Sequence, residues 1–252
     1  MRLVLLALLA VSVGAASAQV NTERMRRALD EDGVFITADA SAAFATGNTE
    51  FFQLGLGGRA DVRFGGDLAF LVGRLDLART NGNAFLDRSF LHARYNHRLA
   101  PRLVTEAFAQ VERNRQQGLD QRTLLGGGGR VEIVDRDSLG LALGATPMLE
   151  IERLDESLGG QQDAVGRLST YLSVRVLAAT GVGITAVTYV QPRFDVPADL
   201  RVLSQVALEV PLSRIVRFRV QANLRHDTRP PGSIEATDLS VENGLVIAFP
   251  AR

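Results

Sequence analysis

Residues 50–64 have the sequence EFFQLGLGGRADVRF, and this stretch decides the fold class. Phe52, Leu56 and Val62 fall on one side of an extended chain, whereas Arg59 and Asp61 fall on the other. Successive side chains of a β-strand point to opposite faces, and a helix of about 3.6 residues per turn cannot reproduce this alternation. The segment therefore predicts a long amphipathic strand with one apolar and one charged face.

The same alternation recurs along most of the chain. It is clearest in 138–152, 200–210, 215–226 and 237–249, and weaker in 34–45, 67–79, 85–97, 102–113, 121–134, 165–177 and 182–192. Together with 50–64 these segments predict about twelve strands, most of them long enough for the roughly 9–11 residues with which a strand crosses a bilayer. The pattern favours a single all-β domain.

Short and longer connections alternate between the predicted strands. Short turns lie at 65–66, 99–101, 135–137, 178–181 and 211–214, and longer polar loops at 79–84, 114–120, 154–162, 194–199 and 227–236; the short first connection, at 46–48, is an exception. Outer-membrane barrels have short periplasmic turns and longer outer loops. We therefore expect an up-and-down antiparallel transmembrane β-barrel of about 12 strands, with both chain ends on the periplasmic side.

The N-terminus has the composition of an export signal. Arg2 precedes an apolar run at 3–13, and Ala16-Ser17-Ala18 follows the small-residue pattern that signal peptidase cleaves. The run is too short for a spanning helix, which needs roughly 20 apolar residues. We expect a signal peptide at 1–18, a periplasmic lead-in at 19–33, the barrel domain at 34–249 and a short tail at 250–252.

Composition narrows the function further. The absence of Cys excludes disulfides and thiolate chemistry, and 28 basic residues balance 28 acidic ones, which argues against a nucleic-acid partner. No long apolar run follows residue 19, so a membrane location requires a closed barrel, in which every backbone group is paired between strands. The expected partners are outer-membrane lipids, the barrel-assembly machinery during insertion, and small polar solutes.

Several short motifs resemble a known family. They are Ala45-Thr46-Gly47-Asn48-Thr49-Glu50 at the first hairpin, the stretch from Leu86-Asp87-Arg88 to Tyr95, the glycine run at 126–129, and the amphipathic end at Phe249. Their order and spacing are similar to those of the YdiY-like family of salt-induced outer-membrane proteins, over residues 35–249. The resemblance implies an outer-membrane barrel and offers neither a substrate nor catalytic residues to carry over.

Charges of opposite sign gather on the polar faces of different strands. The candidate interior charges are Glu106, Glu112, Glu132, Glu150 and Glu152 in one group and Arg167, Arg175, Arg217, Arg219 and Arg225 in the other. If the groups face each other across a water-filled lumen, their field selects and orients small polar or zwitterionic solutes. If they form cross-strand ion pairs, they fill and stiffen a narrow interior. Pairing is favoured, and a narrow channel stays open as an alternative.

The sequence gives little support to an enzyme. An outer-membrane phospholipase uses a Ser and a His on its outer wall, but His92 shares its face with Arg88 and Arg94, and His226 has no Ser at a pairing distance in sequence. We therefore expect no catalytic, metal or cofactor-binding residues. The glycine run at 126–129 is followed by Arg130 instead of Lys and Ser or Thr, so it is not a phosphate loop; we expect a sharp bend of the wall there.

A soluble exported β-protein that binds a lipid is the competing interpretation. A β-sandwich also alternates its faces, and the signal peptide fits either destination. Two features disfavour it: the strands are long for a sandwich, and the face that a sandwich would bury is heavily charged. The leading hypothesis is an integral outer-membrane protein of an envelope or stress-response type.

Overall fold

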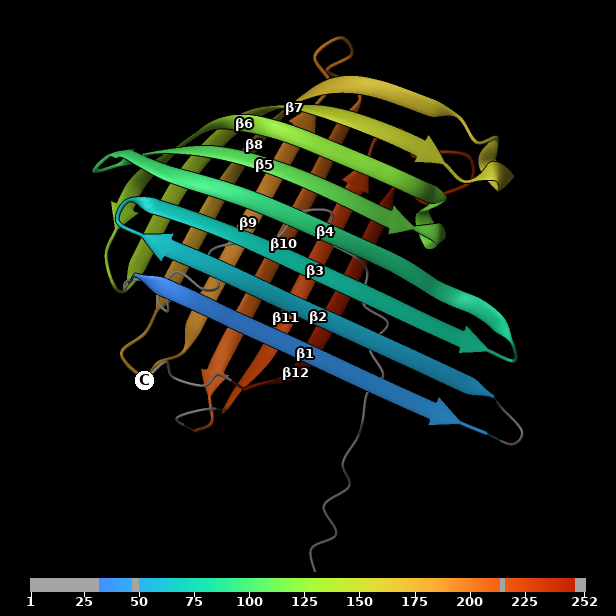
Figure 1. The fold of residues 1–252 in the computed structure, drawn as a ribbon, viewed down its shortest axis with the longest axis horizontal. Helices are drawn as coiled ribbons and strands as arrows, with labels where there is room; N and C mark the ends of the chain where they lie inside the picture. Colours follow the sequence, from blue (N-terminus) through green and yellow to red (C-terminus); the bar gives the residue numbers. More distant parts are fainter. Residues whose placement is uncertain (1–31, 47–49, 214–215, 248–252) are drawn as a thin grey trace, which may run out of the picture.

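One curled sheet makes up the fold in the computed structural model, which describes residues 32–46, 50–213 and 216–247. Its twelve strands lie in sequence order, and each pairs antiparallel with the strand that follows it. The sheet bends back on itself, so that β1–β7 lie over β8–β12 (Figure 1). The predicted all-β, up-and-down architecture of twelve strands is confirmed.

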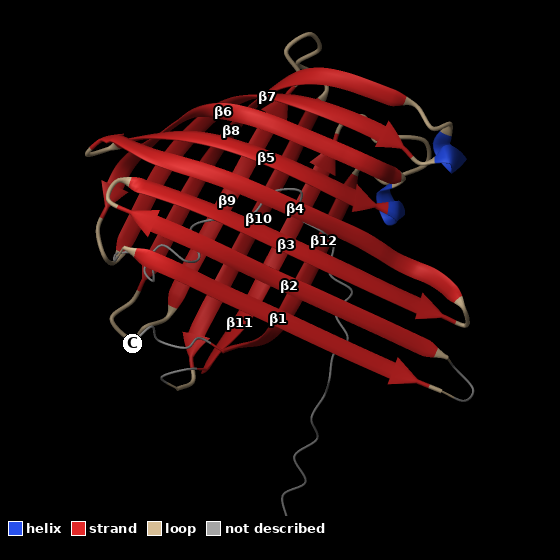
Figure 2. Cartoon of the chain, in the orientation of Figure 1, coloured by secondary structure: helices blue, strands red, loops and turns tan. Residues whose placement is uncertain are grey.

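The strand bounds follow the predicted segments closely. The strands are β1 (Gly33–Ala45), β2 (Phe51–Phe64), β3 (Asp67–Thr80), β4 (Asn83–Ala100), β5 (Leu103–Asn114), β6 (Leu119–Asp135), β7 (Leu139–Leu154), β8 (Gln162–Leu177), β9 (Gly183–Pro192), β10 (Leu200–Pro211), β11 (Val216–Asp227) and β12 (Thr237–Ile247). Two 3-10 turns, η2 (Arg115–Gln117) and η3 (Glu156–Leu158), lie in connections at one end of the sheet (Figure 2). No helix in the described ranges is long and apolar enough to cross a membrane.

Some predictions concern other parts of the chain. The predicted signal peptide at 1–18, nearly all of the lead-in at 19–33 and the tail at 250–252 lie outside the described residues. So do the last two residues of the predicted strand 237–249.

The two faces of the sheet have opposite polarity. On the outside, Leu143 is 49% exposed and Leu91 46%, and the same face carries many further large apolar side chains. On the inside, Arg167 is 2% exposed, and Asp61 and His92 are fully buried. In a soluble protein the apolar face of a sheet is buried and the polar face is exposed. Here the polar face is buried and the apolar face is exposed.

The connections differ from the predicted alternation in the N-terminal half. We call the end of the sheet with the connections at 65–66, 101–102, 136–138, 178–182 and 212–215 the short-turn end, and the opposite end the long-loop end. Longer loops occur at 155–161, 193–199 and 228–236, as expected. The longer loop predicted at 79–84 is wrong, because β3 and β4 are joined by Asn81 and Gly82 alone, with φ of 48° and 78°. Asn-Gly is the preferred pair for such a tight hairpin turn.

The glycine run at 126–129 lies inside β6. A Cβ atom on Gly128 would lie 2.1 Å from the carbonyl oxygen of Ala145 on β7, and no side chain fits there. The β6–β7 register passes from the pair Gly126 and Met148 to the pair Gly129 and Ala145. The run therefore marks a close approach of two backbones within a continuous strand.

Candidate functional site

A network of buried ion pairs occupies the interior of the curled sheet. Glu150 on β7 accepts a hydrogen bond of 2.6 Å from Arg201 on β10 and one of 3.3 Å from Arg167 on β8. Strands β7 and β10 are not neighbours in the sheet, so the Arg201–Glu150 pair crosses the interior. All three side chains are less than a tenth exposed.

The pairs continue from one wall to the other. Arg122 on β6 donates to Glu112 at 2.7 Å and to Glu152 at 2.5 Å. Arg201 donates to Glu152 at 3.1 Å and to Asp227 at 2.8 Å. A continuous chain of alternating charges thus joins β5 to β11. We call the set Glu112, Arg122, Glu150, Glu152, Arg167, Asp199, Arg201 and Asp227 the central ion network.

Arg167 shows how the network satisfies its buried cations. Its guanidinium donates to the backbone carbonyls of Gln191 and Asp199, both at 3.1 Å, to the Asp199 carboxylate at 2.9 Å, and to Glu150. The planar fork of five arginine donors suits several acceptors at once, which lysine could not match. An ion pair buried to this degree persists only when such additional hydrogen bonds offset the loss of hydration.

A second polar contact crosses the interior nearer the short-turn end. The Tyr171 hydroxyl on β8 donates a hydrogen bond of 2.7 Å to Glu106 on β5, across β6 and β7. The ring passes directly over Gly144, where a Cβ atom would lie 2.1 Å from the Tyr171 ring. Gly128 on β6, the cross-strand partner of Glu106, likewise has no side chain on the inner face. Glycines on the inner face of β6 and β7 therefore make this contact possible.

The rings of Phe70, His92 and Phe108 form a stack on the inner face of β3, β4 and β5. His92 is sandwiched between Phe70 and Phe108, with ring centroids 5.9 and 5.6 Å apart, and its Nδ1 lies 2.9 Å from Gln110 Oε1. The guanidinium of Arg59 lies 4.1 Å above the Phe70 ring. His92 is fully buried and packed as part of the interior filling.

The other two histidines have an Asp and a Thr as partners. His97 lies on the outer face, with its Nδ1 2.7 Å from Asp67, which also accepts from the Tyr95 hydroxyl. His226 Nδ1 lies 2.8 Å from Thr237 Oγ1. Within the described ranges, no His side chain hydrogen-bonds to a Ser, and no group of three His, Asp or Glu residues could hold a metal ion.

The predicted interior charges lie in three places. Glu106, Glu112, Glu132, Glu150 and Arg167 are buried on the inner face, and Glu152 is nearly so. Arg175 donates to the carbonyls of Arg136 and Asp137, while Arg217 and Arg219 pair with Glu209, so these three lie toward the short-turn end. Arg225 lines a pocket at the long-loop end. The glutamates are neutralised by nearby arginines and do not form a separate acidic wall.

Two arginines of the network were missing from the predicted set. Arg122 and Arg201 both contact Glu152, and they occupy the centre of the network. Each lies opposite the apolar residues of its own strand, so the period of two that identified the strands could have identified them. The prediction grouped whole strands by the predominant sign of their charges, and this grouping left Arg122 and Arg201 out.

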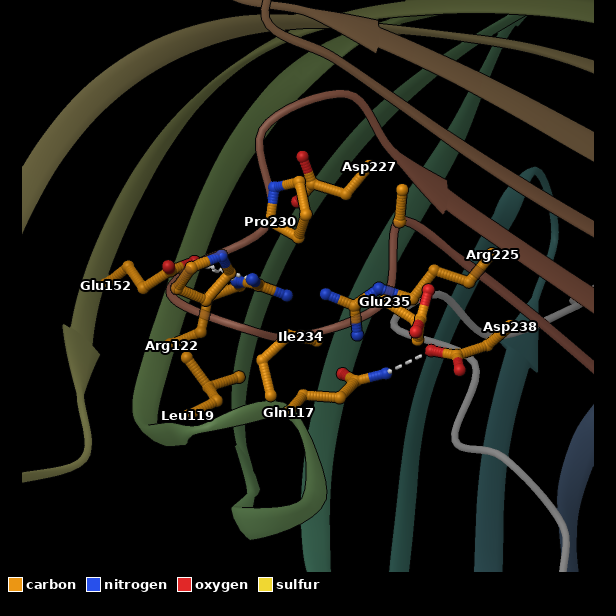
Figure 3. Close-up of a pocket in the computed structure, with 12 residues that line it drawn as sticks. Gln117, Leu119, Arg122, Glu152, Arg225, Asp227, Pro230, Ile234, Glu235 and Asp238 are labelled. Atoms are coloured by element: carbon orange, nitrogen blue, oxygen red, sulfur yellow. Dashed lines mark hydrogen bonds and ion pairs between the residues drawn. The ribbon is translucent and has the colours of Figure 1, made fainter. Parts of the chain in front are cut away.

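A pocket lies above the network at the long-loop end (Figure 3). Arg122 and Glu152 of β6 and β7 line it on one side and Arg225 of β11 on the other, and Pro230 and Ile234 of the β11–β12 loop complete its lining. The centre of a water molecule can occupy about 20 Å³ of this pocket. That is room for about one water.

Two carboxylates in the long loops are held in their charged form. The Ser157 amide donates to Asp155 at 2.9 Å and lowers the pKa of that carboxyl. Two hydrogen bonds from Arg193, of 2.9 and 2.7 Å, lower the pKa of Asp195 to about 2. Both groups therefore keep their charges, and these loop contacts, at any ordinary pH.

Comparison with known proteins supports the fold. The NanC porin superposes with a TM-score of 0.51 at 8% identity, over 86% of this chain and 99% of that one. The translocator domain of the autotransporter NalP from Neisseria meningitidis gives a TM-score of 0.45 at 13% identity, over 90% of this chain and 93% of that one. At such identity the likeness to the porin concerns the fold alone. No curated protein matches the sequence.

A family assignment comes from the sequence itself. The match covers residues 38–249, nearly the whole segment predicted from the motifs at 45–50, 86–95 and 126–129. The YdiY-like resemblance is thereby confirmed, since that name belongs to the same domain family. The chain is a member of DUF481, a family described as proteins of unknown function.

Proposed function

We propose that the chain is an integral outer-membrane protein of an envelope or stress-response type, whose barrel is a narrow polar conduit closed by its own ion pairs. The inverted polarity of the sheet carries the proposal: large apolar side chains such as Leu143 point outward, while Arg167 is 2% exposed inside. The short-turn end then faces the periplasm and the long-loop end faces outward.

The outer face supports membrane insertion. Exposed large apolar side chains occur on every strand from β2 to β11, with Val62, Leu91, Leu149 and Val206 as examples. Soluble monomers rarely expose a continuous apolar surface larger than a few hundred Å². Lipid chains are the natural solvent for such a face, and the hydrogen bonding between successive strands from β1 to β12 suits a hydrocarbon environment.

The inner face supports a narrow conduit for small polar solutes. The Arg201–Glu150 hydrogen bond of 2.6 Å crosses the interior and leaves no wide passage at its level. Charged and polar side chains line the path on both sides of it, from Arg130 and Glu132 to Asp227. Solutes could pass only where these pairs separate or where water fills the space beside them.

A soluble lipid carrier is a poorer fit. A lipid-binding cavity needs an apolar lining, but the buried apolar clusters inside are small: Tyr171, Val187, Tyr189 and Leu203 in one, and Phe108, Leu124 and Met148 in the other. An acyl chain buried there would lie against charged and polar side chains, and it could not replace their hydrogen bonds. The same interior holds no paired Ser and His among the described residues that would suggest an esterase.

Two measurements test the proposal. In cells that express the full chain, we expect the protein in the outer-membrane fraction, resistant to carbonate extraction and with heat-modifiable gel mobility. In planar bilayers we expect small or no conductance from the wild type and a clear increase for Arg201→Gln, with Arg217→Gln at the short-turn end as the matched control. Release by carbonate alone would exclude integral insertion. An Arg201→Gln protein that is folded and inserted but conducts no better than an empty bilayer would exclude the conduit.

A further inference from the structure

The β11–β12 loop, residues 228–236, lies across the long-loop mouth of the barrel (Figure 3). Pro230 and Ile234 of this loop line the pocket opposite Leu119 and Arg122. The loop is closed at its base by a hydrogen bond of 2.9 Å from the Asp227 amide to the Ala236 carbonyl. It therefore has a defined position over the central ion network.

A single leucine from another loop contacts this segment. Leu158, at the end of η3 in the β7–β8 connection, fills the space beside two glycines. A Cβ atom on Gly118 would lie 2.0 Å from Leu158 Cδ1, and one on Gly232 would lie 2.8 Å from Leu158 Cδ2. Both glycines have left-handed φ, of 61° and 58°. The leucine thus packs between the β5–β6 turn and the β11–β12 loop, at two places where only glycine leaves room.

Polar contacts hold the leucine in place, and others anchor the first residue of the loop. The Thr228 amide donates to the Leu200 carbonyl at 3.1 Å, and the Thr228 hydroxyl accepts from the Leu200 amide at 2.8 Å and donates to the Ala198 carbonyl at 2.9 Å. The Asp155 amide donates to the Gly118 carbonyl at 2.8 Å, which fixes the β7–β8 loop against the β5–β6 turn. The hydrogen bond from Gln117 to Asp238, at 3.4 Å, is long and lies at the foot of β12. Leu158 itself is only partly buried. The β11–β12 loop is therefore held at its tip chiefly by one apolar contact.

We propose that Leu158 is a latch that holds the 228–236 loop over the mouth, and that this loop is the outer gate of the barrel. The gating role rests on the proposed conduit, whereas the latch itself does not. Release of Leu158 from Gly232 lets the part of the loop beyond the anchored Thr228 move away from Arg122 and Glu152. The path past the central ion network is then open to solutes from the outside.

Proteolysis tests the latch without any reference to transport. The loop carries Glu235, whose side chain is exposed in the closed loop. A glutamate-specific protease must also bind the neighbouring residues in an extended form, so cleavage there requires the loop to leave the mouth. In the folded full chain in detergent, we expect Leu158→Ala to raise the rate of cleavage after Glu235 about tenfold. The reason is that the loss of roughly two buried carbon groups raises the population of the open loop by about that factor. Leu99→Ala, at the short-turn end, is the matched control and should cleave at the wild-type rate. Equal rates for Leu158→Ala and the wild type would overturn the latch.

Conductance then separates the latch from the conduit. The same two variants, with unchanged heat-modifiable mobility as proof of folding, are inserted into planar bilayers. Faster cleavage together with more frequent openings for Leu158→Ala supports the gate. If Leu158→Ala is cleaved faster but carries no current, and the separate Arg201→Gln protein also fails to conduct, then the loop is latched but the barrel is not a conduit. Faster cleavage with no added openings, where Arg201→Gln does conduct, means that this loop does not gate it.

Discussion

Arg201 is the residue on which the interior depends most. Its guanidinium contacts Glu150, Glu152 and Asp227, from two other strands, at 2.6, 3.1 and 2.8 Å. Hydrophobic replacement of a whole buried ion pair is often tolerated, but removal of one partner leaves uncompensated charge in a dehydrated place. Without Arg201, Glu150 keeps Arg167 and Glu152 keeps Arg122, but each loses a second cation, and Asp227 loses its Arg201 ion pair. The network therefore acts as a unit, and its members cannot be changed singly without cost.

We expect Arg201→Met to destabilise the folded barrel by about 3–5 kcal/mol, because three carboxylates lose their shared cation. Arg217→Met is the control: Arg217 is 49% exposed and pairs with Glu209 at 3.5 Å, so its loss should cost at most about 1 kcal/mol. Urea unfolding in detergent, followed by heat-modifiable mobility, compares the two. Equal midpoints for both variants would show that the central pairs contribute nothing beyond surface ones.

Gly144 is a second residue with a specific structural role. We expect Gly144→Ala to cost about 1–3 kcal/mol, because its methyl group would occupy the Tyr171 ring and displace the hydroxyl from Glu106. Gly127→Ala is the control, since its nearest neighbour is the Glu106 carbonyl oxygen at 3.7 Å. Near-ultraviolet circular dichroism of the tyrosines should change only for Gly144→Ala. A normal tyrosine signal and unchanged stability in Gly144→Ala would contradict the claim that Gly144 makes room for the Tyr171 ring.

At the scale of the elements, tight turns decide where neighbouring strands begin to pair, although the β3–β4 register shifts by one residue between Ala78 and Arg79. The Asn81-Gly82 turn pairs Thr80 with Asn83 and lets β4 run for 18 residues, beyond the predicted bounds 85–97. A polar stretch between two strands looks like a loop, but the Asn-Gly pair within it specifies a tight hairpin with left-handed residues. This local chemistry outweighs the average polarity of the stretch.

We expect Gly82→Ala to slow folding into detergent micelles and to destabilise the barrel by about 1–2 kcal/mol, since alanine is strained at a φ of 78°. Gly66→Ala, in the β2–β3 turn, has no left-handed φ and an ordinary 3.5 Å contact with Arg98, so it should have little effect. Refolding kinetics followed by heat-modifiable mobility give the comparison. A Gly82→Ala protein that refolds like Gly66→Ala would argue against a hairpin that depends on the left-handed residues of this turn.

For the molecule as a whole, the inverted polarity predicts a depth-dependent response to charge. Leu91 lies near the middle of β4 on the outer face and is 46% exposed, whereas Leu99 lies near the end of the same strand and is 61% exposed. We expect Leu91→Arg to destabilise the barrel folded in lipid vesicles by about 2–4 kcal/mol and Leu99→Arg to destabilise it by about 0–1 kcal/mol. Equal tolerance of both changes would indicate that water, not lipid, surrounds this face.

Much of this structure follows from a local rule. The period of two is a property of the extended backbone, so segments such as 50–64 and 138–152 predicted their strands, their outward leucines and their inward charges correctly. Successive long strands with short connections can pair only with their chain neighbours, which accounts for the correct topology. The site was only partly predictable: Glu150 and Arg167 were identified as interior charges, but Arg122 and Arg201 were not.

The sequence by itself determined the strands, the side on which each residue lies, and the exclusion of thiol chemistry. The tertiary structure alone decided which charges meet. Arg201 and Glu150 lie 51 positions apart, on strands that are not neighbours, and they contact each other only because the sheet curls. The same holds for Leu158 between Gly118 and Gly232, because contacts across the interior and between loops depend on the curvature and tilt of the whole sheet, which no local periodicity encodes.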